Sequence, residues 1–340
     1  MKKHHQAFDQ IKSLIDTAQH VVVIQADNPD GDSLGSALAL EEILGALSKT
    51  VDMYCGVDVP YYTHYLPGWS RVSKDLPKDF DLSIIVDTST TTLLDKLLQQ
   101  PQAHVLHERP CIVLDHHQTA NKDIPFATTT INAADVSSTG ELIYHLAHYC
   151  DWPINETAGE SIMTAVLGDT QGLSNSLTLP STYRALADLV EQGVNRPALE
   201  ARRREFNSMP ESVFYYKAKL IERTRLYDDG RVAVVVIPQS EIIEFSPLYN
   251  QPQLIQFDIL QIDTVELVVI IKQYDTGIHT GAVRANYGST YAGALAKQFG
   301  GGGHDYVSGF KTDQYANHTD QLISDIVSAS IPLRENNKTT

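Results

Sequence analysis

Cysteine is scarce in this chain of 340 residues, which contains only Cys55, Cys111 and Cys150. Their odd number and wide spacing provide neither a Cys-x-x-Cys zinc pair nor a disulfide framework, and they are typical of reduced thiols. The sequence also lacks any run of about eighteen apolar residues and the apolar segment of a secretory signal. We therefore expect a cytoplasmic protein without a membrane span or a membrane partner.

Basic residues are also in short supply. The chain has 26 Lys and Arg against 42 Asp and Glu, and its formal net charge is −16. A surface of that sign repels long nucleic acids, whereas a few fixed cations can neutralise the one or two phosphates of a small nucleotide. Solubility is an equally good explanation of the acidic balance. The charge therefore argues against long nucleic acid as a partner but not against short nucleotides.

The sequence does contain a regular alternation of apolar runs and helical spacing, which indicates an α/β fold with a parallel sheet. Strands are predicted at 21–24, 51–54, 82–86 and 111–114. Helices are predicted at 5–18, 93–99, 156–167, 182–193 and 197–206. A further helix is expected after the capping sequence Ser137-Ser138-Thr139-Gly140, because side-chain oxygens there can satisfy the first free backbone amides.

The character of the sequence changes near the turn Asp228-Asp229-Gly230, after which strands are predicted at 231–237, 265–273 and 279–285 and a helix at 290–298. With 42% apolar residues the chain can build two separate cores. The predicted organisation is a parallel-sheet domain over 1–200, a helical linker over 201–227, a smaller α/β domain with a mixed sheet over 228–330 and a disordered tail over 331–340.

Acidic residues and histidines directly follow several of the predicted elements. They are Asp30, Asp32, Asp87, His116, His117 and Asp169. The carboxyl ends of parallel strands share one edge of a sheet, where ligands bind in such folds. Carboxylates with one or two imidazoles suit Mn²⁺ or Mg²⁺, and two such ions could hold a bridging hydroxide and the oxygens of a phosphate. A single Asp at a strand end is more often a turn or cap, so the prediction of metal-dependent phosphoester hydrolysis depends on their joint occurrence.

Five segments together resemble a known family. They are Asn28-Pro29-Asp30-Gly31-Asp32-Ser33-Leu34-Gly35-Ser36, Asp87, Asp115-His116-His117, Asp169 and Gly300-Gly301-Gly302-Gly303-His304. In order and spacing they resemble the DHH phosphoesterases that carry a DHH-associated C-terminal domain, and the resemblance covers nearly the whole chain. The chain is most similar to the branch of bacterial oligoribonucleases (nano-RNases) and 3′-phosphoadenosine 5′-phosphate (pAp) phosphatases. A related branch cleaves cyclic di-AMP or its linear product.

The resemblance implies two Mn²⁺ sites, for which Mg²⁺ is the alternative ion. It implies that Asp30 and Asp87 belong to the first site. The second site would consist of Asp32, Asp87, His116 and Asp169. Asp87 would then bridge the two ions.

The same resemblance implies roles for the residues around the histidine pair. His117 would contact the phosphate, and Asp115 would orient the histidines from behind. The implied catalytic residues are Asp87, His116, His117 and Asp115.

One position departs from the family pattern. The family usually has His two residues before the position of Asn28, where this chain has Ala26. Alanine cannot ligate a metal. Three explanations stay open: Gln25 or Asp27 supplies an oxygen in its place, the first ion is held weakly with extra water, or the chain has lost part of its catalytic competence.

The glycine run in the C-terminal part suggests a substrate site. Consecutive glycines let a backbone approach a ligand closely and present amides to an anion, and His304 can donate to a phosphate. The alternative interpretation of the glycine run is a flexible linker. The alternative for Arg284 is a solvated arginine at the end of a strand. The resemblance implies that Arg284, Gly301, Gly302, Gly303 and His304 bind the nucleotide across a cleft between the domains, where the active site is expected.

The leading hypothesis is a Mn²⁺-dependent phosphodiesterase or phosphatase that hydrolyses nanoRNA, pApA or pAp, with substrates of about two to five nucleotides. The alternatives are a catalytically impaired nucleotide sensor, which Ala26 motivates, and a cyclic di-AMP phosphodiesterase. An inorganic pyrophosphatase would share the metal chemistry but gains no support from the glycine-rich domain. Short RNA or DNA oligonucleotides or mononucleotides are the expected partners, long nucleic acid is not, and homodimerisation stays open.

Overall fold

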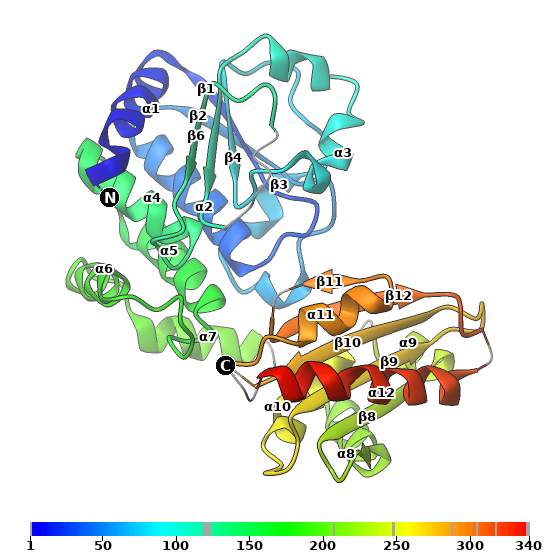
Figure 1. Cartoon of the computed structure of the whole chain (residues 1–340). Coiled ribbons are helices and arrows are strands. Elements are labelled where there is room, and N and C mark those ends of the chain that lie inside the picture. The colour runs from blue at the N-terminus through cyan, green and yellow to red at the C-terminus, as the bar shows by residue number, and fades with distance from the viewer. Residues whose placement is uncertain are drawn as a thin grey trace. The chain divides into compact units, whose positions relative to one another are not determined.

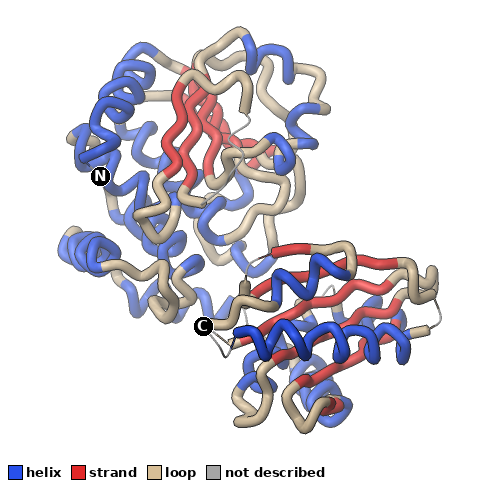
Figure 2. Tube along the Cα trace, viewed as in Figure 1, coloured by secondary structure: helices blue, strands red, loops and turns tan. Residues whose placement is uncertain are grey.

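The computed structural model describes residues 2–117, 124–206, 208–246, 249–286, 288–303, 305–316 and 318–337. The chain forms two compact units, Met1–Ser208 and Met209–Thr340. Each unit contains a six-stranded sheet with helices packed around it (Figure 1; Figure 2). An apolar core lies on each face of either sheet. Among the described helices we find none with the length and hydropathy needed to cross a bilayer.

The N-terminal unit is built on a parallel sheet with the strand order β3-β2-β1-β4-β5-β6. The strands are β1 His20–Ile24, β2 Thr50–Tyr54, β3 Val72–Ser73, β4 Leu82–Val86, β5 Cys111–Asp115 and β6 Thr129–Asn132. The parallel sheet confirms the predicted fold class, and its four central strands match the predicted ones to within one residue. The sequence did not predict β3, which has two residues, or β6, in which Ile131 is the only apolar residue.

Helices surround this sheet. They are α1 His5–Thr17, α2 Gly31–Ala46, α3 Asp95–Leu98, α4 Thr139–Cys150, α5 Glu156–Asp169, α6 Pro180–Glu191 and α7 Arg196–Phe206. Short 3-10 helices are η1 Lys2–His4, η2 Tyr61–Thr63, η3 Trp69–Arg71, η4 Thr91–Leu93 and η5 Ala103–His107. The predicted helix over 93–99 is therefore shorter than expected and continues from a 3-10 turn.

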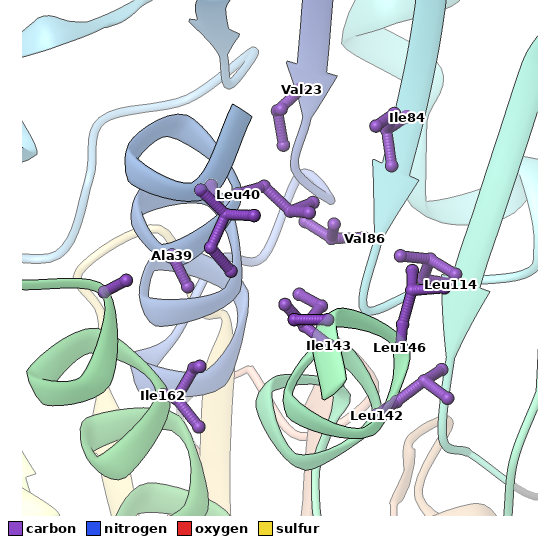
Figure 3. Close-up of a cluster of buried hydrophobic side chains, with 14 of the residues drawn as sticks. Val23, Ala39, Leu40, Ile84, Val86, Leu114, Leu142, Ile143, Leu146 and Ile162 are labelled. Atoms are coloured by element: carbon purple, nitrogen blue, oxygen red, sulfur yellow. The ribbon is translucent and has the colours of Figure 1, made fainter. Parts of the chain in front are cut away.

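The sheet is apolar on both faces because both are covered, as is usual for parallel sheets. On one face Val23, Ile84 and Val86 belong to the same core as Leu40 of α2 and Ile143 of α4, and Figure 3 shows these side chains gathered between sheet and helices. Alternate residues of the same strands face a second core, to which α3 contributes. This explains why the strands read as continuous apolar runs.

Two glycines allow three helices to converge at one edge of the sheet. A Cβ added to Gly35 of α2 would lie 2.6 Å from the Ser161 carbonyl oxygen of α5, and one added to Gly140 of α4 would lie 2.4 Å from Cβ of Ala165. Both distances are too short for real side chains, so these helix separations require glycine. The N-termini of α2 and α4 thereby approach the C-terminal end of α5.

The C-terminal unit contains a mixed sheet with the order β11-β12-β10-β9-β8-β7, in which β8 and β9 are parallel and the other neighbours antiparallel. This confirms the predicted second α/β domain. The strands are β7 Arg225–Tyr227, β8 Val232–Pro238, β9 Leu267–Gln273, β10 His279–Ala285, β11 Gly302–Gly303 and β12 Val307–Thr312. The helices are α8 Glu211–Arg223, α9 Gln239–Phe245, α10 Gln251–Leu260, α11 Ala292–Gln298 and α12 Thr319–Asn337.

The structure differs from the predicted domain limits in two places. The predicted linker over 201–227 is divided between the units, because α8 buries Val213, Tyr216 and Leu220 in a core of the second one. The predicted disordered tail over 331–340 continues α12 as far as Asn337, and residues 338–340 lie outside the described residues. Arg334 explains the order of this segment, since it is only 2% exposed and pairs with Asp228 and Glu266.

We expect Arg334→Ala to lower the free energy of unfolding by about 2 kcal/mol, because two carboxylates lose a charged hydrogen-bond donor. Lys217→Ala is the matched control, since it breaks the more exposed pair with Asp258 in the same unit and should cost less than about 1 kcal/mol. Urea denaturation followed by circular dichroism measures both. Equal effects of the two variants would contradict the role of Arg334.

Candidate metal centre

Asp30 and Asp32 are placed by the start of α2. Asp30 is the N-cap residue, and its Oδ1 accepts hydrogen bonds from the backbone amides of Asp32 at 2.9 Å and Ser33 at 3.1 Å. Such caps satisfy the first free amides of a helix. Asp30 therefore has a structural role in addition to the metal role predicted for it, and Asp32 becomes a fully buried residue of the first turn.

The N-terminus of α4 holds the Asp32 carboxylate. The backbone amide of Thr139 donates to Oδ2 at 2.7 Å, and that of Gly140 donates to Oδ1 at 3.0 Å. The Ser36 hydroxyl adds a hydrogen bond of 3.1 Å to Oδ1. A helix N-terminus stabilises negative charge, so this geometry fixes a buried carboxylate. The sequence indicated the start of this helix but not its role in the site.

His116 joins three carboxylates that come from different elements. Its Nε2 lies 2.8 Å from Asp169 Oδ2, 3.5 Å from Asp32 Oδ2 and 3.8 Å from Asp87 Oδ1. Asp87 follows β4 with a φ of 63° and accepts a hydrogen bond of 3.3 Å from the Thr139 hydroxyl. A left-handed backbone at a non-glycine residue is uncommon and often occurs at functional sites.

His117 lies at the same centre, with its ring centroid 4.4 Å from that of His116. Its Nδ1 lies 2.8 Å from Asp115 Oδ1 and 3.7 Å from Asp87 Oδ1. Asp115 is fully buried, and its second oxygen accepts hydrogen bonds from Ser89 at 2.7 Å and Asn132 at 3.0 Å. The structure thus places Asp115 where it can orient His117. Ser89 and Asn132 are partners that no sequence motif indicated.

The carboxylates of the centre oppose one another electrostatically. Burial, and then repulsion from Asp32 and Asp30, raises the pKa of Asp87 well above its usual value. Burial and the charge of Asp32 also raise the pKa of Asp169 to about 6, and they raise the pKa of Asp30. Burial disfavours the His116 cation, but Asp169 and Asp32 outweigh it and raise the pKa of His116 to about 9.

This donor set fits a divalent cation. Ligand atoms of Asp32, His116 and Asp169 lie within 4.8 Å of one another, and those of Asp87, His116 and His117 do so as well. Carboxylate oxygens with imidazole nitrogens suit Mn²⁺ and Mg²⁺, and a dication would relieve the repulsion that the raised pKa values report. The residues predicted for the second metal site therefore converge.

The residues predicted for the first metal site are less well assembled. Asp30 belongs to neither of the two groups found among the described residues. Ala26 is buried and offers no donor. Of the predicted replacements, Asp27 is turned toward α3, because its Oδ2 accepts a hydrogen bond of 2.8 Å from the Lys96 amide and its Oδ1 lies beside Gly56. Gln25 is fully buried, and both polar atoms of its amide lack a partner among the described residues.

The predicted substrate-binding residues belong to the C-terminal unit. Arg284 lies on β10, and its Nη1 donates to the carbonyls of Val283 at 2.8 Å and Ser308 at 2.9 Å. Gly302 and Gly303 form β11 rather than a loop. An added Cβ at Gly301 would lie 2.0 Å from the Gly309 carbonyl oxygen, so the sheet itself explains that glycine. His304 lies outside the described residues.

Comparison with known proteins shows what the N-terminal unit is similar to. Residues 20–168 match the DHH family, N-terminal domain. A probable bifunctional oligoribonuclease and PAP phosphatase NrnA of Streptococcus mutans is 25% identical over 92% of this chain and 96% of that protein. These findings confirm the predicted resemblance and the class of phosphoester hydrolases.

Two solved structures show the fold. An exopolyphosphatase-related protein from Bacteroides fragilis superimposes with a TM-score of 0.84 and 21% identity, covering 96% of this chain and 97% of that one. RecJ from Thermus thermophilus in complex with Mn²⁺ has a TM-score of 0.53 and 15% identity, covering 99% of this chain and 55% of that one.

Asp87→Asn tests the repulsion in the metal centre, and Asn tolerates the same left-handed backbone. We expect the metal-free variant to melt at the same or a higher temperature than the metal-free wild type, because one buried charge is removed. Mn²⁺ should raise the melting temperature of the wild type but not that of the variant. Differential scanning calorimetry at pH 7.5 measures both effects. A destabilised variant that Mn²⁺ still stabilises would contradict the assignment.

Glu141, in the first turn of α4, caps the N-terminus of that helix. Its Oε2 accepts hydrogen bonds from the Ser137 amide at 3.0 Å and the Thr182 hydroxyl at 2.8 Å. Burial opposes its ionisation, but hydrogen bonds from His145, Ser137 and Thr182 outweigh it and lower the pKa to about 2. Its stabilising effect is therefore full above pH 4.5 and is lost as pH falls toward 2.

Glu141→Gln should accordingly be less stable than the wild type at pH 7, by a difference on the order of 3 kcal/mol. The difference should shrink as pH falls below 4.5, because the Glu141 carboxyl group then becomes protonated in the unfolded state, whereas in the folded state it stays ionised until the pH approaches its pKa of about 2. Urea midpoints of both proteins between pH 7 and pH 3 measure it. A difference that does not change with pH would show that Glu141 acts only through packing.

Proposed function

We propose that this protein is a Mn²⁺-dependent phosphoesterase that hydrolyses short nucleotides such as pApA and pAp. The observation that carries the proposal is the convergence of buried carboxylates on His116. They are Asp32, Asp87 and Asp169. The match of residues 20–168 to the DHH family supports the reaction class, and the name of the Streptococcus mutans relative supports the substrates. The Mn²⁺ in RecJ from Thermus thermophilus agrees with the proposed ion.

In this proposal the chain holds the ion through Asp32, Asp87, His116 and Asp169. A bound divalent ion would polarise the phosphoryl oxygens and lower the pKa of an attacking water. The α4 amides keep Asp32 in place before substrate arrives, which avoids reorganisation during the reaction. Asp115 forms a hydrogen bond with Nδ1 of His117, which leaves Nε2 of that ring for a phosphate oxygen. The His117 side chain is 38% exposed, so a phosphate can reach it.

Size and charge favour small substrates. A net charge of −16 makes tight binding of a long polyanion unfavourable, whereas one or two phosphates can be neutralised at a metal centre. We propose Arg284 as a further phosphate contact. Its Nη1 donates hydrogen bonds to two backbone carbonyls, so the guanidinium group is already held in place on β10.

A catalytically impaired nucleotide sensor is the second candidate. The specific observation in its favour is that Asp30 stands outside the groups of ligand atoms found among the described residues, beside a buried Ala26. In that case one ion would bind tightly and nucleotide binding would persist without turnover. Ala26→His would then create hydrolysis, whereas in an active enzyme it should change the rate only modestly.

An activity screen with pApA, pAp, cyclic di-AMP and short RNA in Mn²⁺ and in Mg²⁺ tests the proposal. We expect hydrolysis of pApA or pAp. Asp87→Asn should lower the rate of hydrolysis by more than about 100-fold, which is the most that removal of a residue that only orients a metal ligand typically costs. Asp95→Asn, which removes an exposed carboxylate from the same unit, should keep wild-type activity. No hydrolysis of any of the four substrates would refute the enzyme and favour the sensor.

A further inference from the structure

Hydrogen-bond donors enclose the carboxylate of Asp115. Its Oδ1 accepts a hydrogen bond of 3.2 Å from the His117 backbone amide and lies 2.8 Å from Nδ1 of the same residue. Its Oδ2 accepts hydrogen bonds from the Ser89 hydroxyl at 2.7 Å and the Asn132 side-chain amide at 3.0 Å. One oxygen of this buried carboxylate therefore serves His117, and the other is held by two residues that the proposed reaction does not use.

Asn132 closes these contacts into a ring. Its side-chain amide has two N–H donors, and Nδ2 lies 3.3 Å from Ser89 Oγ as well as 3.0 Å from Asp115 Oδ2. The Ser89 hydroxyl donates its own proton to Asp115. Because Ser89 and Asn132 also contact each other, the Asp115 carboxylate cannot turn without breaking hydrogen bonds at both of its oxygens.

The ends of three neighbouring strands supply this ring. Asn132 is the last residue of β6 and the register partner of Asp115 at the end of β5, and the Ala133 amide donates to the Asp115 carbonyl at 2.8 Å. Ser89 lies three residues beyond the end of β4, the strand on the other side of β5, and is only 2% exposed. Sites supported by sheet strands are held more precisely than sites on loops.

A fixed Asp115 determines how the His117 ring lies. The groups that meet the side-chain oxygens of Asp115 are N–H and O–H groups, so the carboxylate accepts and Nδ1 of His117 carries the proton between the two residues. Nε2 is then the ring nitrogen that faces away from Asp115, on a side chain that is 38% exposed. Asp115 thus sets both the tautomer and the direction of the imidazole.

We propose that Asn132 and Ser89 are positioning residues that hold the His117 ring in place through Asp115. The inference rests on the proposed function, because the contact of His117 with a phosphate is what requires a fixed ring. Without either donor, Asp115 Oδ2 loses a partner, the carboxylate gains freedom to turn, and the His117 ring turns with it. Residues that orient a ligand in this way contribute to a reaction without touching the substrate.

Proton–nitrogen NMR of the protein with isotope-labelled histidine and Mg²⁺, which is not paramagnetic, tests the proposal. The hydrogen bond to Asp115 should protect the Nδ1 proton of His117 from exchange with water, so the wild type should show its signal, assigned by its loss in His117→Gln. Asn132→Ala and Ser89→Ala should each lose or broaden this signal. Thr130→Ala, which removes an exposed side chain from the same strand as Asn132, is the matched control and should keep it.

A role confined to stability would lower the melting temperature of both variants and leave the signal unchanged. The proposal is overturned by an Nδ1 signal that persists unaltered in Asn132→Ala and Ser89→Ala, or by the absence of that signal from the wild type.

Hydrolysis of pApA gives a second readout. Asn132→Ala should lower the rate by about 10- to 100-fold, because a displaced His117 no longer meets the phosphate. Its affinity for Mn²⁺, measured by calorimetry, should not change, since the proposed metal ligands are untouched, and a parallel loss of that affinity would also overturn the proposal. Absence of hydrolysis by the wild type would count against the proposed function instead, and the NMR comparison would still decide whether Asn132 and Ser89 position His117.

Discussion

Repulsion among buried carboxylates is the constraint on which the N-terminal unit depends. Asp32 and Asp87 are both buried near His116, and the raised pKa values around them show that the cluster is costly in the absence of a cation. The fold offsets part of this cost with the amides of Thr139 and Gly140, which bind both oxygens of Asp32. Carboxylates that are buried and held in place in this way are preorganised for a dication.

The rest of the unit can be understood as the means of bringing these charges together. Gly35 and Gly140 let α2 and α4 approach α5 closely enough for three helix ends to meet. The parallel sheet supplies Asp87 and the histidine pair from the ends of β4 and β5. Glu141 then secures the α4 N-terminus by accepting a hydrogen bond from the Ser137 amide. The sheet, the helix packing and the helix capping therefore all position the same cluster of carboxylates and histidines.

Much of this could be predicted from the sequence, because buried parallel strands are apolar throughout and acidic residues follow them directly. The strand β6 could not be predicted because Thr129 and Thr130 are polar. The order of the C-terminal helix depends on partners of Arg334 that are distant in sequence. The hydrogen bond from the Lys96 amide of α3 to Asp27 is equally tertiary and could not be foreseen. What the sequence lacks is information on which backbone amides reach a carboxylate.

The most direct test of the account is anomalous diffraction from crystals of the protein grown with Mn²⁺. The account predicts an anomalous peak bounded by Asp32, Asp87, His116 and Asp169, with a second and weaker peak near Asp30. Occupancy of the weaker peak would show how far Ala26 impairs the first site. A well-ordered centre without any anomalous peak between these residues, at saturating Mn²⁺, would contradict the assignment of a metal-dependent phosphoesterase.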